Sequence, residues 1–158
     1  NVSLDLAKKF PTNQFENIVE IGAGYGGQAL ILEKFYNIKH YTLIDLPQVN
    51  KLIEKFFSHH SPKFNYSFSE IESYKNKEKY DLFISNYAFS ELPKQLQLIA
   101  VKNILCNASY GYMIVNNFSK FSFRYLSQSQ YAENLKNMKI FEEIPESYIF
   151  NKVLTFKY

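Results

Sequence analysis

The chain is poor in the features that mark secreted and membrane-spanning proteins. Its single cysteine, Cys106, cannot form a disulfide within the chain, which fits a reducing cytoplasm. No apolar run approaches the roughly 20 residues of a membrane-spanning helix. The chain starts at Asn1 without a methionine or a basic, then apolar leader, so we expect a trimmed or partial chain without a signal peptide. These absences predict a cytoplasmic protein without a membrane span.

Arginine is also scarce. Only Arg124 is an arginine among the 18 basic residues, and the lysines are scattered from Lys8 to Lys157. Proteins that bind nucleic acid usually concentrate their positive charge and place arginine forks on phosphates and guanines. The net charge of +3 therefore does not predict a nucleic-acid partner.

The composition that remains is that of one globular domain. The 158 residues are enough to bury a substantial core. Hydrophobic residues make up 46% of the chain and charged residues 21%, which excludes wholesale disorder. No internal repeat, low-complexity tract or linker divides the sequence, so we expect residues 1–158 to form a single domain.

The most informative stretch is a cluster of glycines. Four of the five glycines fall within six residues: Gly22, Gly24, Gly26 and Gly27. An apolar run of strand type precedes them at 18–21, and apolar residues resume at helical spacing over 26–36, where we expect Leu30, Ile31 and Phe35 to face the sheet. A strand, a glycine turn and a helix let the backbone approach a nucleotide closely, because glycine tolerates positive φ and carries no Cβ.

The rest of the chain alternates strands and helices. Short apolar or alternating runs predict strands at 18–21, 39–44, 64–68, 80–85, 111–115, 140–144 and 152–156. Helical spacing predicts helices at 4–10, 26–36, 92–107 and 127–138, and one that starts at Pro47. This order predicts an α/β fold with a mainly parallel sheet and helices on both faces. The last two strands have no helix between them and are expected to pair antiparallel, and helix 4–10 is expected to cover one edge of the sheet.

In such a sheet a ligand lies beyond the carboxyl ends of the strands. Asp45 ends the second strand, 23 positions after Gly22, where an acid can accept hydrogen bonds from both hydroxyls of a ribose. The alternative is that Asp45 caps the following helix. Polar residues also follow the third, fourth and fifth strands, at Ser69–Glu70, Asn86–Glu91 and Asn116–Asn117.

The charge of the ligand is indicated by Glu20. The glycine spacing alone is ambiguous, because it satisfies both G-x-G-x-x-G, the dinucleotide pattern, and G-x-G-x-G. Glu20 stands inside the strand, two residues before Gly22, where a carboxylate would crowd an anionic pyrophosphate but would suit a cationic ligand. The alternative is a partly solvated strand residue without a ligand.

These residues together resemble a known family. Residues 19–26 (VEIGAGYG), Asp45, and residues 80–86 (YDLFISN) resemble class I S-adenosylmethionine-dependent methyltransferases over nearly the whole chain. More narrowly, residues 20–27 (EIGAGYGG) and 85–91 (SNYAFSE) are similar to sugar O-methyltransferases. The resemblance implies a Rossmann-like seven-stranded sheet, mostly parallel with an antiparallel C-terminal strand pair, and S-adenosylmethionine as the cofactor.

The resemblance also implies roles for individual residues. The backbone of the glycine turn would contact the methionine part of the cofactor, Glu20 would favour its positive charges and Asp45 would hold the ribose. The residues of the turn and of the other strand ends that would contact the cofactor are Gly22, Ala23, Gly24 and Gly26 for methionine, Leu46 and Ile71 beside adenine, Ser69 or Glu70 near its amino group, and Asn86 at the ammonium group. Tyr87 would form the floor below the methyl group.

The expected acceptor is a small molecule or glycan with a sugar hydroxyl. A hydroxyl is a poor nucleophile, so a general base would help, and Glu91 is the candidate from its place after the fourth strand. Its alternative is an acid in the first turn of helix 92–107 that opposes the helix dipole. No metal site is predicted from the three histidines, although some sugar O-methyltransferases use a divalent ion.

Two other functions remain open. An NAD-dependent oxidoreductase is supported by the G-x-G-x-x-G spacing, but little chain follows for a substrate domain. The third candidate is a cofactor-binding or interaction domain without turnover.

Overall fold

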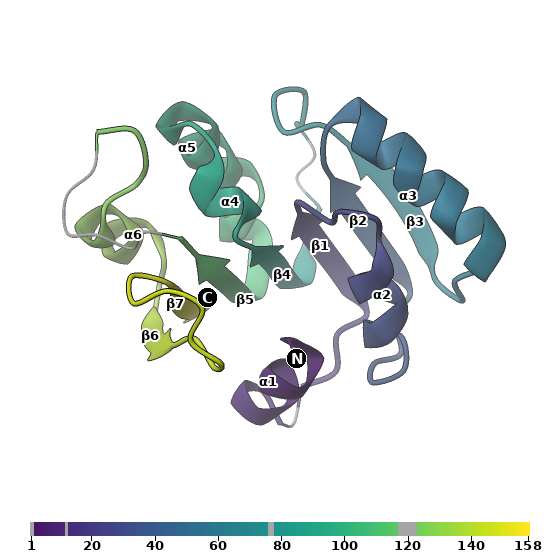
Figure 1. Cartoon of the computed structure of the whole chain (residues 1–158), viewed down its shortest axis with the longest axis horizontal. Helices are drawn as coiled ribbons and strands as arrows, with labels where there is room; N and C mark the ends of the chain where they lie inside the picture. The colour runs from purple at the N-terminus through teal and green to yellow at the C-terminus, as the bar shows by residue number, and fades with distance from the viewer. Residues whose placement is uncertain (1, 12, 76–77, 117–122) are drawn as a thin grey trace.

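The computed structural model describes residues 2–11, 13–75, 78–116 and 123–158 and has one seven-stranded sheet (Figure 1). The strands are β1 (Asn17–Ile21), β2 (His40–Ile44), β3 (Asn65–Ser69), β4 (Tyr80–Asn86), β5 (Ala108–Val115), β6 (Lys139–Glu142) and β7 (Lys152–Lys157). Their order is β3-β2-β1-β4-β5-β7-β6. The first five strands are parallel, and β7 lies antiparallel between β5 and β6. The predicted α/β sheet with an antiparallel terminal pair is thus confirmed.

Helices cover both faces of this sheet. They are α1 (Val2–Lys9), α2 (Gly27–Leu32), α3 (Pro47–His60), α4 (Ala88–Glu91), α5 (Lys94–Asn103), the 3-10 helix η1 (Leu105–Asn107) and α6 (Gln128–Asn134). Buried residues of α1, α2 and α3 form one core, and those of α4, α5, η1 and α6 form the other. Neighbouring residues of β1 enter opposite cores, Ile18 the first and Val19 the second. This two-sided burial explains the continuous apolar runs of the central strands.

The prediction for the first helix was wrong in length and for two of the three residues expected to face the sheet, whereas the third, Leu30, packs against the core. α2 ends at Leu32, and the buried residues are Ala29, Leu32 and, just after the helix, Tyr36. Ile31 and Phe35 are 43% and 45% exposed. The buried residues follow the three- and four-residue spacing of one helical face. The apolar residues of this stretch fit more than one such face, and their periodicity alone does not decide which face is buried.

The predicted helix 92–107 is divided into α4, α5 and η1. Leu92 and Pro93 are extended, with ψ of 144° and 143°, because a proline disfavours the helical region for the residue before it. The inner face of α5 contains a polar residue beside Ala100 and Val101. Gln97 is fully buried, where it donates to the Phe89 carbonyl (2.9 Å) and accepts from the Leu126 amide (2.7 Å).

Helix α1 lies over a face of the sheet rather than over its edge. Leu6 is fully buried in the same core as Ile18 and Tyr112. Asp5 accepts a 2.9 Å hydrogen bond from the hydroxyl of Tyr112 in β5. The helix therefore covers the sheet near β5, and the expected placement at the edge was wrong.

No helix in the described part of the chain is long and apolar enough to cross a membrane.

Candidate functional site

The carboxyl ends of β1, β2 and β3 meet the segment that follows β4 around a cavity of about 130 Å³. Its lining residues are Ile21, Gly22, Ile44, Asp45, Leu46, Glu70, Ile71, Glu72, Ala88, Leu92 and Leu96. The structure thus brings together Gly22, Asp45, Leu46, Glu70 and Ile71, which the sequence placed at three separate strand ends. Pockets that enclose a whole ligand usually measure roughly 300–1,000 Å³, so this cavity is large enough for one ring-sized part of a ligand.

Backbone hydrogen bonds fix the strand ends around this cavity. The Gly22 amide donates to the Ile44 carbonyl (3.0 Å), and the Asp45 amide donates to the Ser69 carbonyl (3.1 Å). The side-chain amide of Asn50 in α3 donates to the carbonyls of Asp45 (3.2 Å) and Ser69 (3.0 Å). Ser69 thus supports the site through its backbone and, unlike Glu70, does not line the cavity. Asn50 was missed in the sequence, and the signal that could have found it is its place on the buried face of α3, three residues before Ile53.

The glycine turn is in the left-handed region at three positions. The φ angles of Gly22, Gly24 and Gly26 are 79°, 60° and 86°, which other residues rarely adopt. A Cβ on Gly22 would lie 2.0 Å from the Cβ of Ala88, whereas a Cβ on Gly24 would meet nothing within 4 Å. Gly22 therefore permits close packing against α4, and Gly24 leaves open space at the turn. The side chain of Ala23 belongs to the core, so its backbone is the part available to a ligand.

Asp45 does not cap α3. The residue at the cap position is Leu46, without a side-chain cap hydrogen bond, and Pro47 begins the helix. One carboxylate oxygen of Asp45 accepts from the Leu46 amide (2.8 Å). The other has no hydrogen-bond partner within the described ranges and remains available for donors in the cavity. The capping alternative from the sequence is excluded.

Glu20 is a buried carboxyl group in the strand that leads into the turn. It is 1% exposed, and its Oε2 accepts a 2.7 Å hydrogen bond from the hydroxyl of Tyr41 in β2. Burial raises the pKa of Glu20 from 4.5 to about 7, with a smaller contribution from the charge of Asp45, and the Tyr41 hydrogen bond opposes the rise. The site therefore destabilises the negative charge of Glu20, and a nearby cation would stabilise it. The alternative of a solvated strand residue does not hold.

Asn86 and Gln28 form a polar pair beside the turn. The Asn86 Nδ2 donates to Gln28 Oε1 (2.7 Å). Asn86 Oδ1 and Gln28 Nε2 are buried and lack a partner among the residues that the structure describes. A buried polar atom without a hydrogen bond is costly, so one acceptor and one donor are left for a ligand with both kinds of group. Gln28 was missed in the sequence because its role depends on the distant Asn86.

Tyr87 follows Asn86 in a strained conformation. Its φ of 68° is a genuine outlier for a bulky residue and costs about 1–3 kcal/mol. The Tyr87 hydroxyl donates to Glu143 in the β6–β7 loop. Glu143 also accepts from the Ser147 hydroxyl (2.5 Å) and amide (3.2 Å). Burial and the hydrogen bond to Glu143 raise the pKa of Tyr87, so Tyr87 stays neutral and is a donor rather than a base.

Glu91 lies in α4, the short helix that follows β4. It is the last residue of α4, well before α5 begins at Lys94, so it is not the first-turn acid of a long helix. Its Oε1 accepts a 2.5 Å hydrogen bond from Asn116 Nδ2. Glu91 lines a cavity of about 280 Å³ with Pro93, Arg124 and Tyr125. Asn117, the other polar residue expected after β5, lies outside the described residues.

Among the residues that the structure describes, no group of three His, Cys, Asp or Glu side chains could hold a metal ion.

No family model and no curated protein matches the chain, but solved structures share its fold. The N-terminal domain of EvdMO1, solved in the presence of SAH (S-adenosylhomocysteine) and D-fucose, is 11% identical with a TM-score of 0.75, and the match covers 99% of this chain and 81% of that one. The S-adenosylmethionine-dependent methyltransferase SibL is 11% identical with a TM-score of 0.69 over 98% and 54% of the two chains. A candidate O-methyltransferase from Nostoc punctiforme is 10% identical with a TM-score of 0.72 over 100% and 56%. The chain therefore shares the fold of these three structures, and it spans about half the length of the last two, both named as methyltransferases.

Proposed function

We propose that the protein transfers a methyl group from S-adenosylmethionine to a hydroxyl of a sugar or glycan precursor. The proposal of this cofactor rests on the cavity that brings Gly22, Asp45, Leu46 and Ile71 together at the carboxyl edge of the sheet. The buried Glu20 beside this edge favours a positively charged ligand over a dinucleotide pyrophosphate. The likeness in fold to methyltransferases agrees with both points.

The residues present fit each part of this cofactor. The free carboxylate oxygen of Asp45 would accept hydrogen bonds from the ribose, and Leu46 and Ile71 would contact the adenine. Asn86 Oδ1 would accept from the ammonium group, and Gln28 Nε2 would donate to the carboxylate, so both of these buried atoms, which lack a partner among the described residues, would gain one. When bound, S-adenosylmethionine supplies a methyl group already activated by its sulfonium charge.

The acceptor would lie beyond the ends of β4 and β5. Glu91 would take the proton of the acceptor hydroxyl, and its contact with Asn116 orients the carboxylate. Tyr87, whose hydroxyl donates to Glu143, would form the floor below the methyl group. These groups supply alignment and one proton acceptor, which is what methyl transfer to a hydroxyl requires of a protein.

A sugar acceptor is supported by two observations. The segment that carries Tyr87 and Glu91 is similar to the same segment of sugar O-methyltransferases. EvdMO1, which has the same fold, was solved in the presence of D-fucose. An NAD-dependent oxidoreductase is the second candidate, favoured only by the G-x-G-x-x-G spacing of the turn.

Calorimetric titration with S-adenosylhomocysteine, S-adenosylmethionine and NAD tests the cofactor. We expect the first two to bind and NAD not to bind. Asp45→Ala should weaken both adenosyl ligands by about 1.5–3 kcal/mol, the value of a hydrogen bond to a charged group. Glu54→Ala, which removes an exposed acid from α3, is the matched control and should leave both affinities unchanged.

Three outcomes would count against the proposal. Binding of NAD alone would support the oxidoreductase, and binding of none of the three ligands would favour a domain without this cofactor. Equal affinities of wild type and Asp45→Ala would show that the carboxylate has a purely structural role.

A further inference from the structure

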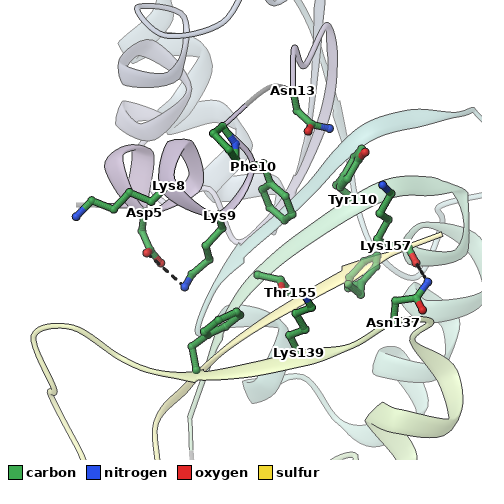
Figure 2. A pocket seen from close by; sticks show the side chains of 13 residues that line it. Asp5, Lys8, Lys9, Phe10, Asn13, Tyr110, Asn137, Lys139, Thr155 and Lys157 are labelled. Carbon is green, nitrogen blue, oxygen red and sulfur yellow. Dashed lines mark hydrogen bonds and ion pairs between the residues drawn. The ribbon is translucent and has the colours of Figure 1, made fainter.

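A second cavity lies at the other end of the sheet, between α1 and the strands β5, β7 and β6 (Figure 2). Its volume is about 810 Å³, against about 130 Å³ for the cavity at the glycine turn. Tyr110 in its wall is near the start of β5 and lies opposite Lys157 of β7. Val115 at the ligand edge comes five positions after Tyr110, which is roughly 17 Å along a strand. A ligand here would be separate from one at the glycine turn.

Positive charge is concentrated in this cavity. Lys8 and Lys9 of α1, Lys139 of β6 and Lys157 of β7 line it, with Asp5 as the acid among the lining residues. Lys9 forms an ion pair with Asp5 (3.5 Å). The other three lysines make no ion pair within the described ranges. Like charges gathered in a concave surface produce a positive potential that an anion would relieve.

Aromatic rings lie among these charges. The Lys9 ammonium lies 3.6 Å from the centre of the Phe141 ring, and the Lys157 ammonium lies 5.2 Å from that of Tyr110. Phe10 contacts Tyr110 edge to face at 5.2 Å between centroids, and Figure 2 shows Phe10 between α1 and the strands. The pocket therefore offers apolar ring surface directly beside ammonium groups.

Polar groups complete one end of the cavity. Asn13 and Lys157 line the cavity with Tyr110, and as hydrogen-bond donors they lower the pKa of its hydroxyl. Lysine presents a compact charge with three donors and binds phosphate as a point charge. The only arginine of the chain, Arg124, does not line this cavity.

We propose that this cavity is a binding site for a small phosphorylated compound whose phosphate meets Lys139 and Lys157 and whose ring lies against Phe10 and Tyr110. The volume is within the range of pockets that hold small ligands. The site does not depend on the cofactor at the glycine turn, and it can exist whether or not the protein is a methyltransferase.

Titration of the ¹⁵N-labelled protein with inorganic phosphate, phenyl phosphate and glucose 6-phosphate tests this site by amide chemical shifts. We expect shifts at Tyr110, Lys139 and Lys157, and tighter binding of at least one ring-bearing phosphate than of inorganic phosphate. The double variant Lys139→Gln/Lys157→Gln should weaken that ligand by about tenfold, because contacts of ammonium groups with phosphate are charge-assisted hydrogen bonds. Both lysines are exposed, so the variant should fold as wild type does.

The double variant Lys55→Gln/Lys102→Gln is the matched control, since it removes the same charge from exposed positions of α3 and α5. Equal losses in the two double variants would show general attraction to a basic protein and overturn the site. Shifts centred on the glycine turn, or no binding of any probe, would also overturn it. If phenyl phosphate binds more tightly than glucose 6-phosphate, the ring is aromatic, and the reverse order indicates a sugar. Equal affinity of all three probes would contradict the part assigned to Phe10 and Tyr110.

Discussion

Replacement of Glu20 by glutamine should make the protein more stable at alkaline pH. The side chain is buried and its pKa is raised from 4.5 to about 7, mainly by burial. Glutamine has nearly the same shape, and its carbonyl oxygen can still accept the hydrogen bond from Tyr41. The variant therefore removes the cost of a buried charge while it keeps the packing of β1 against β2.

The direction in which pH changes the stability follows from the pKa of Glu20 in the folded and in the unfolded chain. Below pH 4.5 the Glu20 carboxyl is protonated in both the folded and the unfolded chain, and it contributes no pH dependence. Between 4.5 and about 7 the unfolded chain has lost this proton and the folded chain has kept it, so the free energy of unfolding falls as the pH rises. Above about 7 the full loss is reached, which at 1.36 kcal/mol per pH unit is about 3 kcal/mol.

Urea unfolding of wild type and Glu20→Gln at pH 4.5 and pH 8 measures this effect. The difference in unfolding free energy between variant and wild type should rise by about 3 kcal/mol from the lower to the higher pH. Glu54→Gln, an exposed acid on α3, should show no comparable rise. If Glu20→Gln is no more stable relative to wild type at pH 8 than at pH 4.5, the raised pKa is refuted.

The same variant should lose affinity for S-adenosylmethionine at pH 8, and lose less for S-adenosylhomocysteine, which lacks the sulfonium charge. Equal losses for the two ligands would remove the electrostatic role proposed for Glu20. A gain in stability with a loss of cofactor affinity would identify Glu20 as a residue kept for binding at the expense of the fold.

Two further substitutions test the turn and the acceptor side. Gly22→Ala should destabilise the protein by about 2–4 kcal/mol, because the added Cβ would lie 2.0 Å from that of Ala88 and φ is 79°. Gly24→Ala should cost only about 1 kcal/mol, because its added Cβ would meet no atom within 4 Å. Equal melting temperatures of the two variants would contradict the packing argument. Glu91→Gln should lower turnover on a sugar acceptor by about 10²–10⁴-fold without changing the affinity for S-adenosylhomocysteine, and full turnover with an unchanged pH profile would show that Glu91 is not the base.

The strands and the ligand edge could be predicted from the sequence because their signals are local. A strand buried on both faces must be apolar throughout, and a turn with three positive φ angles requires glycine, so residues 18–26 were readable without knowledge of the rest. The place of Asp45 at the ligand edge could be predicted because it ends the second strand, 23 positions after Gly22. These features depend on the backbone of one segment and on the parallel order of the strands.

The polar pairs could not be predicted because they join segments that are distant in the sequence. Gln28 meets Asn86 across 58 residues, and Tyr87 meets Glu143 across 56. Which polar residues meet depends on the register of the sheet and on which face each helix buries. Neither of these can be obtained from a single sequence. The helix α2 shows the same limit, since its apolar residues are compatible with more than one buried face.

The position of β7 determines the order in which the sheet can be completed during translation. β6 leaves the ribosome before β7, but among the described strands β7 is the neighbour with which β6 pairs. Until Lys152–Lys157 has been synthesised, the outer edge of β5 is unpaired and the apolar residues Ile140 and Phe141 of β6 have no strand beside them. An open strand edge is prone to pair with other chains. A nascent chain that stalls between β6 and β7 should therefore be a target for chaperones, even though the glycine turn and Asp45 have already been made.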